Sequence, residues 1–364
     1  METAKTGKVK EIKLEDMGYG SFFESNMKNL KLNNYLVGRV IAQYKGLYRV
    51  RIESGEYLAK ITGKQMSDAL SREDYPAVGD WVYMTEVDTE RAMINGILPR
   101  KNILRKNDGN NREIRIIAAN IDVAFIIESV DKDYNLNRFE RYFVLAKNGN
   151  IKPVIVLNKI DLVSKEELSL KMGQLKDRFN NVDIIPSSII AEHGLDEVTR
   201  YIKRGKTYCF LGSSGVGKSS LINKLLGRPA IKIGGLNLHT GKGKHTTTGR
   251  EMYLLENGGI VIDNPGMREI GMSGSSLGID SLFSEIIKLS KNCKYGNCTH
   301  SHEPGCAVLS AVKSKDLDED KYLNYIKLKR EAENYSMAKF KKRDGRGFGK
   351  FGKKASKKIE NDKS

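Results

Sequence analysis

A glycine-rich loop at residues 212–219 has the spacing G-x-x-x-x-G-K-[ST], which is typical of phosphate-binding loops. It follows an apolar run that predicts a strand (TYCFL) and precedes a run that predicts a helix (SSLINKLL), as the motif requires. Glycines let backbone N–H groups face a β-phosphate, the lysine reaches the β- and γ-phosphates, and the serine after it offers a hydroxyl to Mg²⁺. The predicted phosphate-binding residues are Gly212, Ser213, Ser214, Gly215, Val216, Gly217, Lys218 and Ser219, with Ser219 also a magnesium ligand.

A second polar motif, NKID, follows the apolar run PVIVL and should lie at the carboxyl end of that strand, where open α/β sheets bind ligands. A carboxylate there can accept hydrogen bonds from N1–H and the 2-amino group of guanine, a donor pair that adenine lacks. By itself the tetrapeptide is typical of any polar loop, but two serines also close the next predicted strand. The predicted guanine-binding residues are Asn158, Lys159, Ile160, Asp161, Ser187 and Ser188.

The sequence DNPG ends a third apolar run, GIVID. There Asp263 can hold a Mg²⁺-bound water, and the N–H of Gly266 can meet the γ-phosphate. Between this motif and the P-loop, the basic segment GKGKHTTTGR can supply a hydroxyl to the same metal from Thr247 or Thr248. Either segment alone would be interpreted as an ordinary surface loop, whereas together they predict a pair of γ-phosphate sensors.

The residue after DNPG is Met267, where Ras-type GTPases have the glutamine that orients the attacking water. We therefore expect slow intrinsic turnover. His245 is the candidate catalytic residue, and a role in orienting water is weighed evenly against one in shaping the switch loop.

The order of the motifs is rotated along the chain. Ordinary GTPases place the P-loop first and the NKxD and serine motifs last, whereas here NKID and the serines precede the P-loop. DNPG consequently leads directly into the C-terminal segment. A change at the γ-phosphate could therefore act on that segment.

Three cysteines and one histidine lie within a short C-terminal stretch with the spacing C-x4-C-x-H-x5-C. This ligand set predicts a closed, structural zinc site with no free position for catalysis. The predicted ligands of one Zn²⁺ are Cys293, Cys298, His300 and Cys306, while His302 is interpreted as a bystander and Cys209 stands apart.

The surrounding patterns predict several domains around these motifs. Short alternating runs from Tyr35 to about Lys106 predict a small antiparallel barrel of OB type, in which Trp81 is expected to pack rather than stack on a base. Alternating strands and helices from Ile116 to Asp263 predict a mainly parallel α/β sheet, the P-loop GTPase domain with permuted motifs. The predicted domains are a lead-in at 1–34, the barrel at 35–110, the GTPase domain at 111–275, a helical zinc-binding module at 276–336 and a basic disordered tail at 337–364.

The net charge of +17 and the pI near 9.5 indicate a polyanionic partner. Nucleic acid is favoured over a membrane surface because no basic amphipathic helix with a clean apolar face stands out. A charged N-terminus and the absence of a long apolar run lead us to expect a cytoplasmic protein. Candidate RNA-contacting charges lie in the tail and at Arg100, Lys101, Arg105, Lys106, Lys242, Lys244 and Arg250.

The order NKID, SS, GSSGVGKSS, HTTT and DNPG, followed by the cysteine–histidine cluster, resembles the bacterial RsgA family of small-subunit-dependent GTPases. The resemblance covers roughly Tyr35 to Asn334 and implies GTP binding that extends to Ser220, zinc binding by the four ligands, and a catalytic role for His245. It also implies slow GTP hydrolysis stimulated by the small ribosomal subunit and its rRNA, in late maturation of that subunit, with release of another assembly factor. Asn264 and Lys244 depart from the family's more usual Thr and Arg.

Two other functions remain open at this stage. A P-loop ATPase or kinase would not need the base-reading carboxylate of NKID. A non-catalytic or GTP-switched RNA-binding scaffold with another RNA target would suit the barrel, the cluster and the tail, although Lys218, Ser219 and Asp263 weigh against the non-catalytic form. We expect a monomer with no membrane partner.

Overall fold

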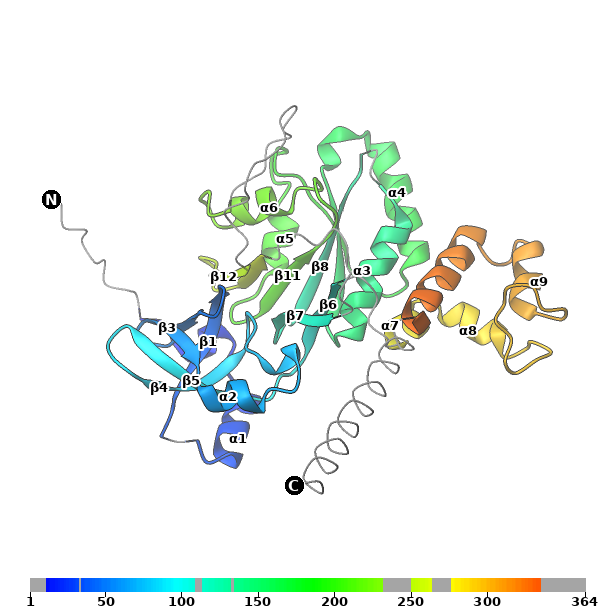
Figure 1. The fold of residues 1–364 in the computed structure, drawn as a ribbon. Helices are drawn as coiled ribbons and strands as arrows, with labels where there is room; N and C mark the ends of the chain where they lie inside the picture. The colour runs from blue at the N-terminus through cyan, green and yellow to red at the C-terminus, as the bar shows by residue number, and fades with distance from the viewer. Residues whose placement is uncertain are drawn as a thin grey trace, which may run out of the picture. The chain divides into compact units, whose positions relative to one another are not determined.

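The computed structural model describes residues 11–32, 34–108, 113–131, 134–231, 250–263 and 276–334 (Figure 1). The chain divides into two units, of which one combines Met1–Arg105 with Arg115–Glu269 and the other combines Lys106–Ile114 with Ile270–Ser364. His245, Thr247, Thr248, Gly266 and the basic tail lie outside the described residues. Within the described residues, no helix combines the length and the apolar character needed to cross a membrane.

The first unit begins with a closed barrel, which confirms the predicted OB-type fold. Its described strands are β1 (Leu36–Gln43), β2 (Tyr48–Arg51), β3 (Glu56–Ile61), β4 (Trp81–Glu86) and β5 (Arg91–Ile97). They pair in the order β1-β2-β3-β5-β4, and β4 pairs back with β1 to close the barrel. Alternating apolar residues such as Val40, Val50 and Ile94 fill its interior. Two short helices, α2 (Gly63–Asp68) and η2 (Arg72–Asp74), connect β3 to β4.

The lead-in packs against one side of the barrel. It contains η1 (Leu14–Met17) and α1 (Ser21–Asn29). Trp81 is fully buried, and its ring lies 4.8 Å from that of Tyr19 and 5.7 Å from that of Phe23, measured between centroids. The packing role predicted for Trp81 is therefore confirmed, and the lead-in supplies its neighbours.

A buried arginine joins three segments of the first unit. Arg39 on β1 is 1 % exposed and donates to the carbonyl oxygens of Met17, Gly79 and Asn120. Burial lowers its pKa to about 10, although the charges of Asp122 and Asp80 oppose that shift. Because removal of a buried charge's partners is strongly destabilising, Arg39 fixes the lead-in, the barrel and the start of the next sheet to one another.

A mainly parallel sheet follows, as the alternating pattern predicted. Its described strands are β8 (Val123–Ser129), β9 (Lys152–Asn158), β10 (Ile184–Pro186), β11 (Thr207–Leu211), β12 (Arg250–Leu254) and β13 (Ile260–Asp263). They run in the order β10-β9-β8-β11-β13-β12, with β12 antiparallel to β13 and also paired with β1 of the barrel. β8 is buried along its whole length, as expected of a central strand covered on both faces. β6 (Ile103–Asp108) and β7 (Glu113–Ala119) pair separately.

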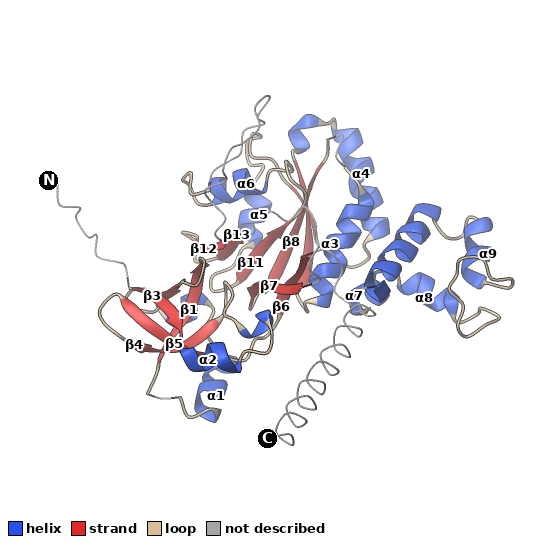
Figure 2. Cartoon of the chain, in the orientation of Figure 1, coloured by secondary structure: helices blue, strands red, loops and turns tan. Residues whose placement is uncertain are grey.

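Helices cover both faces of this sheet, with α3 and α4 on one side and α5 and α6 on the other (Figures 1 and 2). The bounds are α3 (Leu136–Asn148), η3 (Ile160–Leu162), α4 (Lys165–Arg178), α5 (Asp196–Tyr201) and α6 (Lys218–Leu225). Side chains of Asn135 and Ser164 accept backbone N–H bonds at the starts of α3 and α4, which explains why these helices begin there.

The described part of the second unit is mainly helical. It contains α7 (Leu277–Leu282), α8 (Ser284–Ser290), α9 (Ala307–Lys313) and a further helix over residues 319–334. The cysteine cluster lies in the segment between α8 and α9. The predicted helical module is therefore confirmed.

Candidate active site and metal centre

The predicted nucleotide-binding residues gather at one edge of the parallel sheet. NKID follows β9, the two serines follow β10, the P-loop follows β11, and Asp263 ends β13. Because β10, β9, β8, β11 and β13 are consecutive parallel neighbours, their carboxyl ends lie along the same edge. This edge is where such sheets bind ligands.

Two glycines let the P-loop lie against the neighbouring strands. Gly212 has φ +150°, and a Cβ atom there would lie 2.0 Å from the carbonyl oxygen of Ile127 on β8. Gly217 has φ +98°, and a Cβ atom there would lie 2.5 Å from Nδ2 of Asn158. Both positions therefore require glycine for space as well as for backbone conformation.

Asn158 links the two main motifs. Its Nδ2 donates to the carbonyl oxygen of Val216 at 2.8 Å, and its Oδ1 accepts from Oγ of Ser187 at 3.0 Å. The side chain is almost fully buried. Asn158 and Ser187 thus hold the NKID loop, the serine loop and the P-loop in one arrangement.

Lys159 and Asp161 of the NKID motif lie at the carboxyl-end edge of the sheet. Lys159 has φ +62°, and its Nζ lies 2.9 Å from Oδ2 of Asp131. Asp161 is exposed and accepts a hydrogen bond from Oγ of Ser188, whose own oxygen accepts from the N–H groups of Ile190 and Ala191. The serine loop therefore orients the carboxylate that was predicted to read the base.

The P-loop lysine contacts the backbone of the loop itself. Nζ of Lys218 donates to the carbonyl oxygens of Gly212, at 2.8 Å, and Ser213. Ser219 and Ser220 follow Lys218 in the first turn of α6. The ammonium group is consequently held against the backbone at the start of the loop.

Sequence analysis missed two acidic residues at the end of β8. Oε1 of Glu128 accepts from N and Oγ of Ser213, at 3.2 and 2.9 Å. Three residues later Asp131 pairs with Lys159. The sequence ESVD matches no named motif. Its position after a buried strand that adjoins the P-loop strand is the signal that could have drawn attention to it.

Two of the basic residues predicted to contact RNA pair with acidic residues of the first unit. The guanidinium of Arg100 donates to both carboxylate oxygens of buried Asp80, each at 2.7 Å, and to the carbonyl oxygens of Glu73 and Tyr75. Arg105 pairs with the Glu73 carboxylate at 2.8 Å. The donors of Arg100 therefore hold the segment between β3 and β4, while a contact of Arg100 or Arg105 with RNA stays a prediction.

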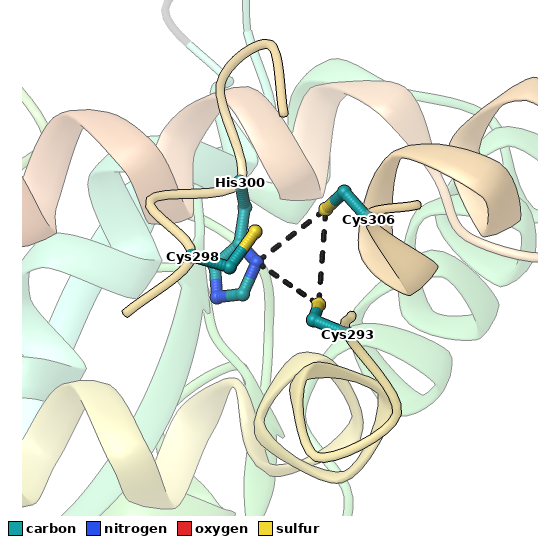
Figure 3. A group of neighbouring side chains, drawn as sticks. All are labelled: Cys293, Cys298, His300 and Cys306. Carbon is teal, nitrogen blue, oxygen red and sulfur yellow. Dashed lines mark hydrogen bonds between the residues drawn. The ribbon is translucent and has the colours of Figure 1, made fainter. Parts of the chain in front are cut away.

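In the second unit the four predicted metal ligands converge (Figure 3). Nδ1 of His300 lies 3.6 Å from Sγ of Cys293 and 3.5 Å from Sγ of Cys306, and these two sulfurs are 3.9 Å apart. All four ligand atoms, including Sγ of Cys298, lie within 4.8 Å of one another. Tetrahedral Zn²⁺ with ordinary bond lengths requires S–S separations of about 3.8 Å and S–N separations of about 3.5 Å. The cluster could hold a metal ion of this size.

Neighbouring groups shape the cluster. The carboxylate of Glu303 accepts from the backbone N–H groups of Thr299, Ser301 and His302, and the hydroxyl of Tyr322 donates to the carbonyl oxygen of His300 at 2.7 Å. Burial lowers the pKa of His300, which favours the neutral imidazole that binds metal. Glu303 therefore holds the ligand loop from within, and Tyr322 holds it from the helix over residues 319–334.

The sequence and the fold of this chain are similar to those of known proteins. Residues 97–273 match the RsgA GTPase family. The small ribosomal subunit biogenesis GTPase RsgA 2 of Lactiplantibacillus plantarum is 40% identical, over 83% of this chain and 84% of its own. YjeQ from Thermotoga maritima superposes with a TM-score of 0.62 at 29% identity, over 82% of this chain and 98% of its own. YloQ, a circularly permuted GTPase, shares the fold with a TM-score of 0.58 at 23% identity, over 83% of this chain and 96% of its own.

Proposed function

The chain belongs to the RsgA family of GTPases and is therefore a GTP hydrolase, and we propose that it acts in late maturation of the small ribosomal subunit. One observation carries the proposal: base-reading, phosphate-binding and metal-binding residues lie along one sheet edge, in the permuted order, ahead of the metal cluster. The partners would be the small subunit with its rRNA, and another assembly factor that is released. We further propose a cytoplasmic monomer with the domain limits expected from the sequence.

In the proposed site, Asp161 reads guanine and the P-loop from Gly212 to Ser220 holds the phosphates. The hydrogen bond from Ser188 to Asp161 supports the first role, because it fixes one carboxylate oxygen and thereby orients the group. The hydrogen bonds from Lys218 back to the first residues of the loop support the second.

Mg²⁺ fits the oxygen ligands available at this edge, since Ser219 lies in the first turn of α6, Asp263 ends β13, and α6 contacts β13. When bound, Mg²⁺ would neutralise charge on the β- and γ-phosphates. Asp263 would act on it through a bound water, and Thr247 or Thr248 would be the further ligand. The N–H of Gly266 would sense the γ-phosphate, so loss of that phosphate would act on the segment leading to residues 276–334.

We assign Zn²⁺ to the cluster of Cys293, Cys298, His300 and Cys306, with a structural role. The donor set of three thiolates and one imidazole supports zinc, because soft ligands in a closed tetrahedron disfavour Mg²⁺ and leave no position for substrate. The C-terminal module that docks on rRNA would then be stabilised by the bound metal.

Hydrolysis without a partner should be slow because Met267 cannot orient water. We propose that docking on the small subunit completes the site, with His245 as the candidate for orienting the water. The test is GTP turnover by the full chain with purified small subunits, with large subunits as the control. Stimulation by small subunits alone is expected. A chain that binds GTP but never hydrolyses it under either condition would favour the RNA-binding scaffold.

A further inference from the structure

A buried carboxyl group lies directly behind the phosphate-binding loop. Glu128 is 0 % exposed and stands next to last in β8, a strand whose other residues are also buried. β8 pairs in parallel with β11, so the end of β8 lies beside the start of the P-loop. Burial of a charge disfavours folding unless the charge is compensated. The burial of the Glu128 carboxyl group therefore needs a functional or structural explanation.

The contacts of Glu128 are confined to one side of its carboxyl group. Oε1 accepts both the backbone N–H and the hydroxyl of Ser213. Oε2 is buried and has no hydrogen-bond partner among the described residues, which is uncommon for a buried polar atom. On the far side of the same residue, Lys218 binds the carbonyl oxygen of Ser213. The Ser213 backbone is thus held by an anion at its N–H and by a cation at its C=O.

The groups that face Glu128 come from three elements. Burial raises its pKa, while the Ser213 hydrogen bonds and the charges of Arg138 on α3 and Lys218 on α6 oppose that rise. Tyr142, also on α3, faces Ser213 and Glu128. Two donors and two cations therefore offset part of the cost of burying the carboxylate. The phosphates of a bound nucleotide would lie close to the same charges.

We propose that Glu128 is a positioning residue that shapes the P-loop and also limits how tightly the loop holds nucleotide. Its hydrogen bonds to Ser213 fix the loop. Its negative charge acts as the counter-charge of Lys218 when the loop is empty, and it repels the phosphates when nucleotide is bound. Release of GDP is thereby promoted. This inference rests on the proposed function, because it requires the P-loop to bind guanine nucleotides.

Two substitutions at the same position separate charge from hydrogen bonding. Glu128→Gln keeps a carbonyl oxygen for the Ser213 donors and removes the charge, whereas Glu128→Ala removes both. Two like charges several ångströms apart at an effective permittivity near 20 repel enough to change affinity roughly tenfold. Loss of two hydrogen bonds to a charged acceptor should lower nucleotide affinity by roughly tenfold or more.

The experiment measures GDP and GTP affinity, and the GDP release rate, for the full chain with fluorescent nucleotide analogues. We expect Glu128→Gln to bind GDP roughly tenfold more tightly than wild type and to release it more slowly. Glu128→Ala should bind at least about tenfold more weakly than Glu128→Gln. Ser213→Ala, which removes only the hydroxyl donor, should weaken binding less than the loss of both bonds, and it remains informative if Glu128→Ala does not fold.

The matched control is Glu140→Gln on α3. Glu140 is equally buried and pairs with Arg178 at 2.6 Å, away from the P-loop. The Glu140→Gln variant should change the melting temperature of the protein without changing its affinity for nucleotide. Unchanged or weaker GDP binding by Glu128→Gln would overturn the inference, as would equal affinities for the glutamine and alanine variants. If wild type itself fails to bind GDP, the proposed function fails, which is a distinguishable result.

Discussion

The nucleotide-binding edge and the metal cluster position their residues by different physical means. At the edge, β8 and its parallel neighbours are buried, and hydrogen bonds such as that from Asn158 to Val216 connect the loops. In the cluster, the ligands come from loop segments and from the start of α9, and several of the surrounding residues are exposed. The edge is therefore formed by the sheet itself, whereas we propose that the cluster depends on a bound metal to hold its loops together.

The largest expected effect is loss of the metal. Cys298→Ser should abolish binding of one zinc per chain and unfold the ligand loops, because structural zinc contributes on the order of 10 kcal/mol or more to such folds. GDP affinity should stay within about twofold, because the sheet edge has its own packing. Metal analysis measures the zinc content of the variant, and nucleotide titration measures its affinity for GDP.

The control for this variant is Cys209→Ala, at the buried cysteine of β11 that lies outside the cluster. It should keep its zinc. Loss of both zinc and nucleotide by Cys298→Ser would show that the two units fold as one and would remove the contrast between them.

The next effect concerns the P-loop backbone. Gly217→Ala should weaken GDP binding by roughly ten- to hundredfold, because it adds strain of about 1–3 kcal/mol at a positive φ and displaces the Asn158 amide. Gly227→Ala has a similar φ of +65° but open space around it, so it should lower stability without changing affinity. Equal affinities for the two variants would indicate that the contact with Asn158 does not matter.

A more specific effect, confined to the choice of base, is expected at Asp161. Asp161→Asn should shift preference from GTP towards xanthosine triphosphate by roughly ten- to hundredfold, because its amide can donate to the carbonyl that replaces guanine's amino group. Asp177→Asn, at an exposed carboxyl of α4, is the control. A preference that does not move would remove Asp161 from base recognition.

The smallest effect lies beside the metal cluster. Tyr322→Phe removes the hydrogen bond to the carbonyl oxygen of His300 and should weaken zinc retention by about 1 kcal/mol. Competition with a chelator measures this change. A loss as large as that of Cys298→Ser would mean that Tyr322, rather than the metal, organises the ligand loop.

The features that could be predicted from the sequence are those encoded within short, continuous segments of the chain. The P-loop, NKID and the cysteine cluster each have local spacing, and the barrel and the parallel sheet follow from alternating apolar runs. Arg39, Glu128 and Asp131 could not be assigned, because their partners lie far along the chain and only the folded sheet brings them together. The pairing of Arg100 with buried Asp80 could not be predicted either, because composition does not show which cations pair with a carboxylate in the folded chain.

The central claim is that a slow GTPase with a preformed nucleotide edge is completed by the small ribosomal subunit. The most direct test follows kcat and KM for GTP with and without small subunits, over a series of salt concentrations. We expect subunits to raise kcat with little change in KM. Salt should remove this stimulation before it weakens GTP binding, because each phosphate contact with RNA contributes about one unit to the log–log salt slope. Turnover that small subunits leave unchanged at low salt would contradict the claim.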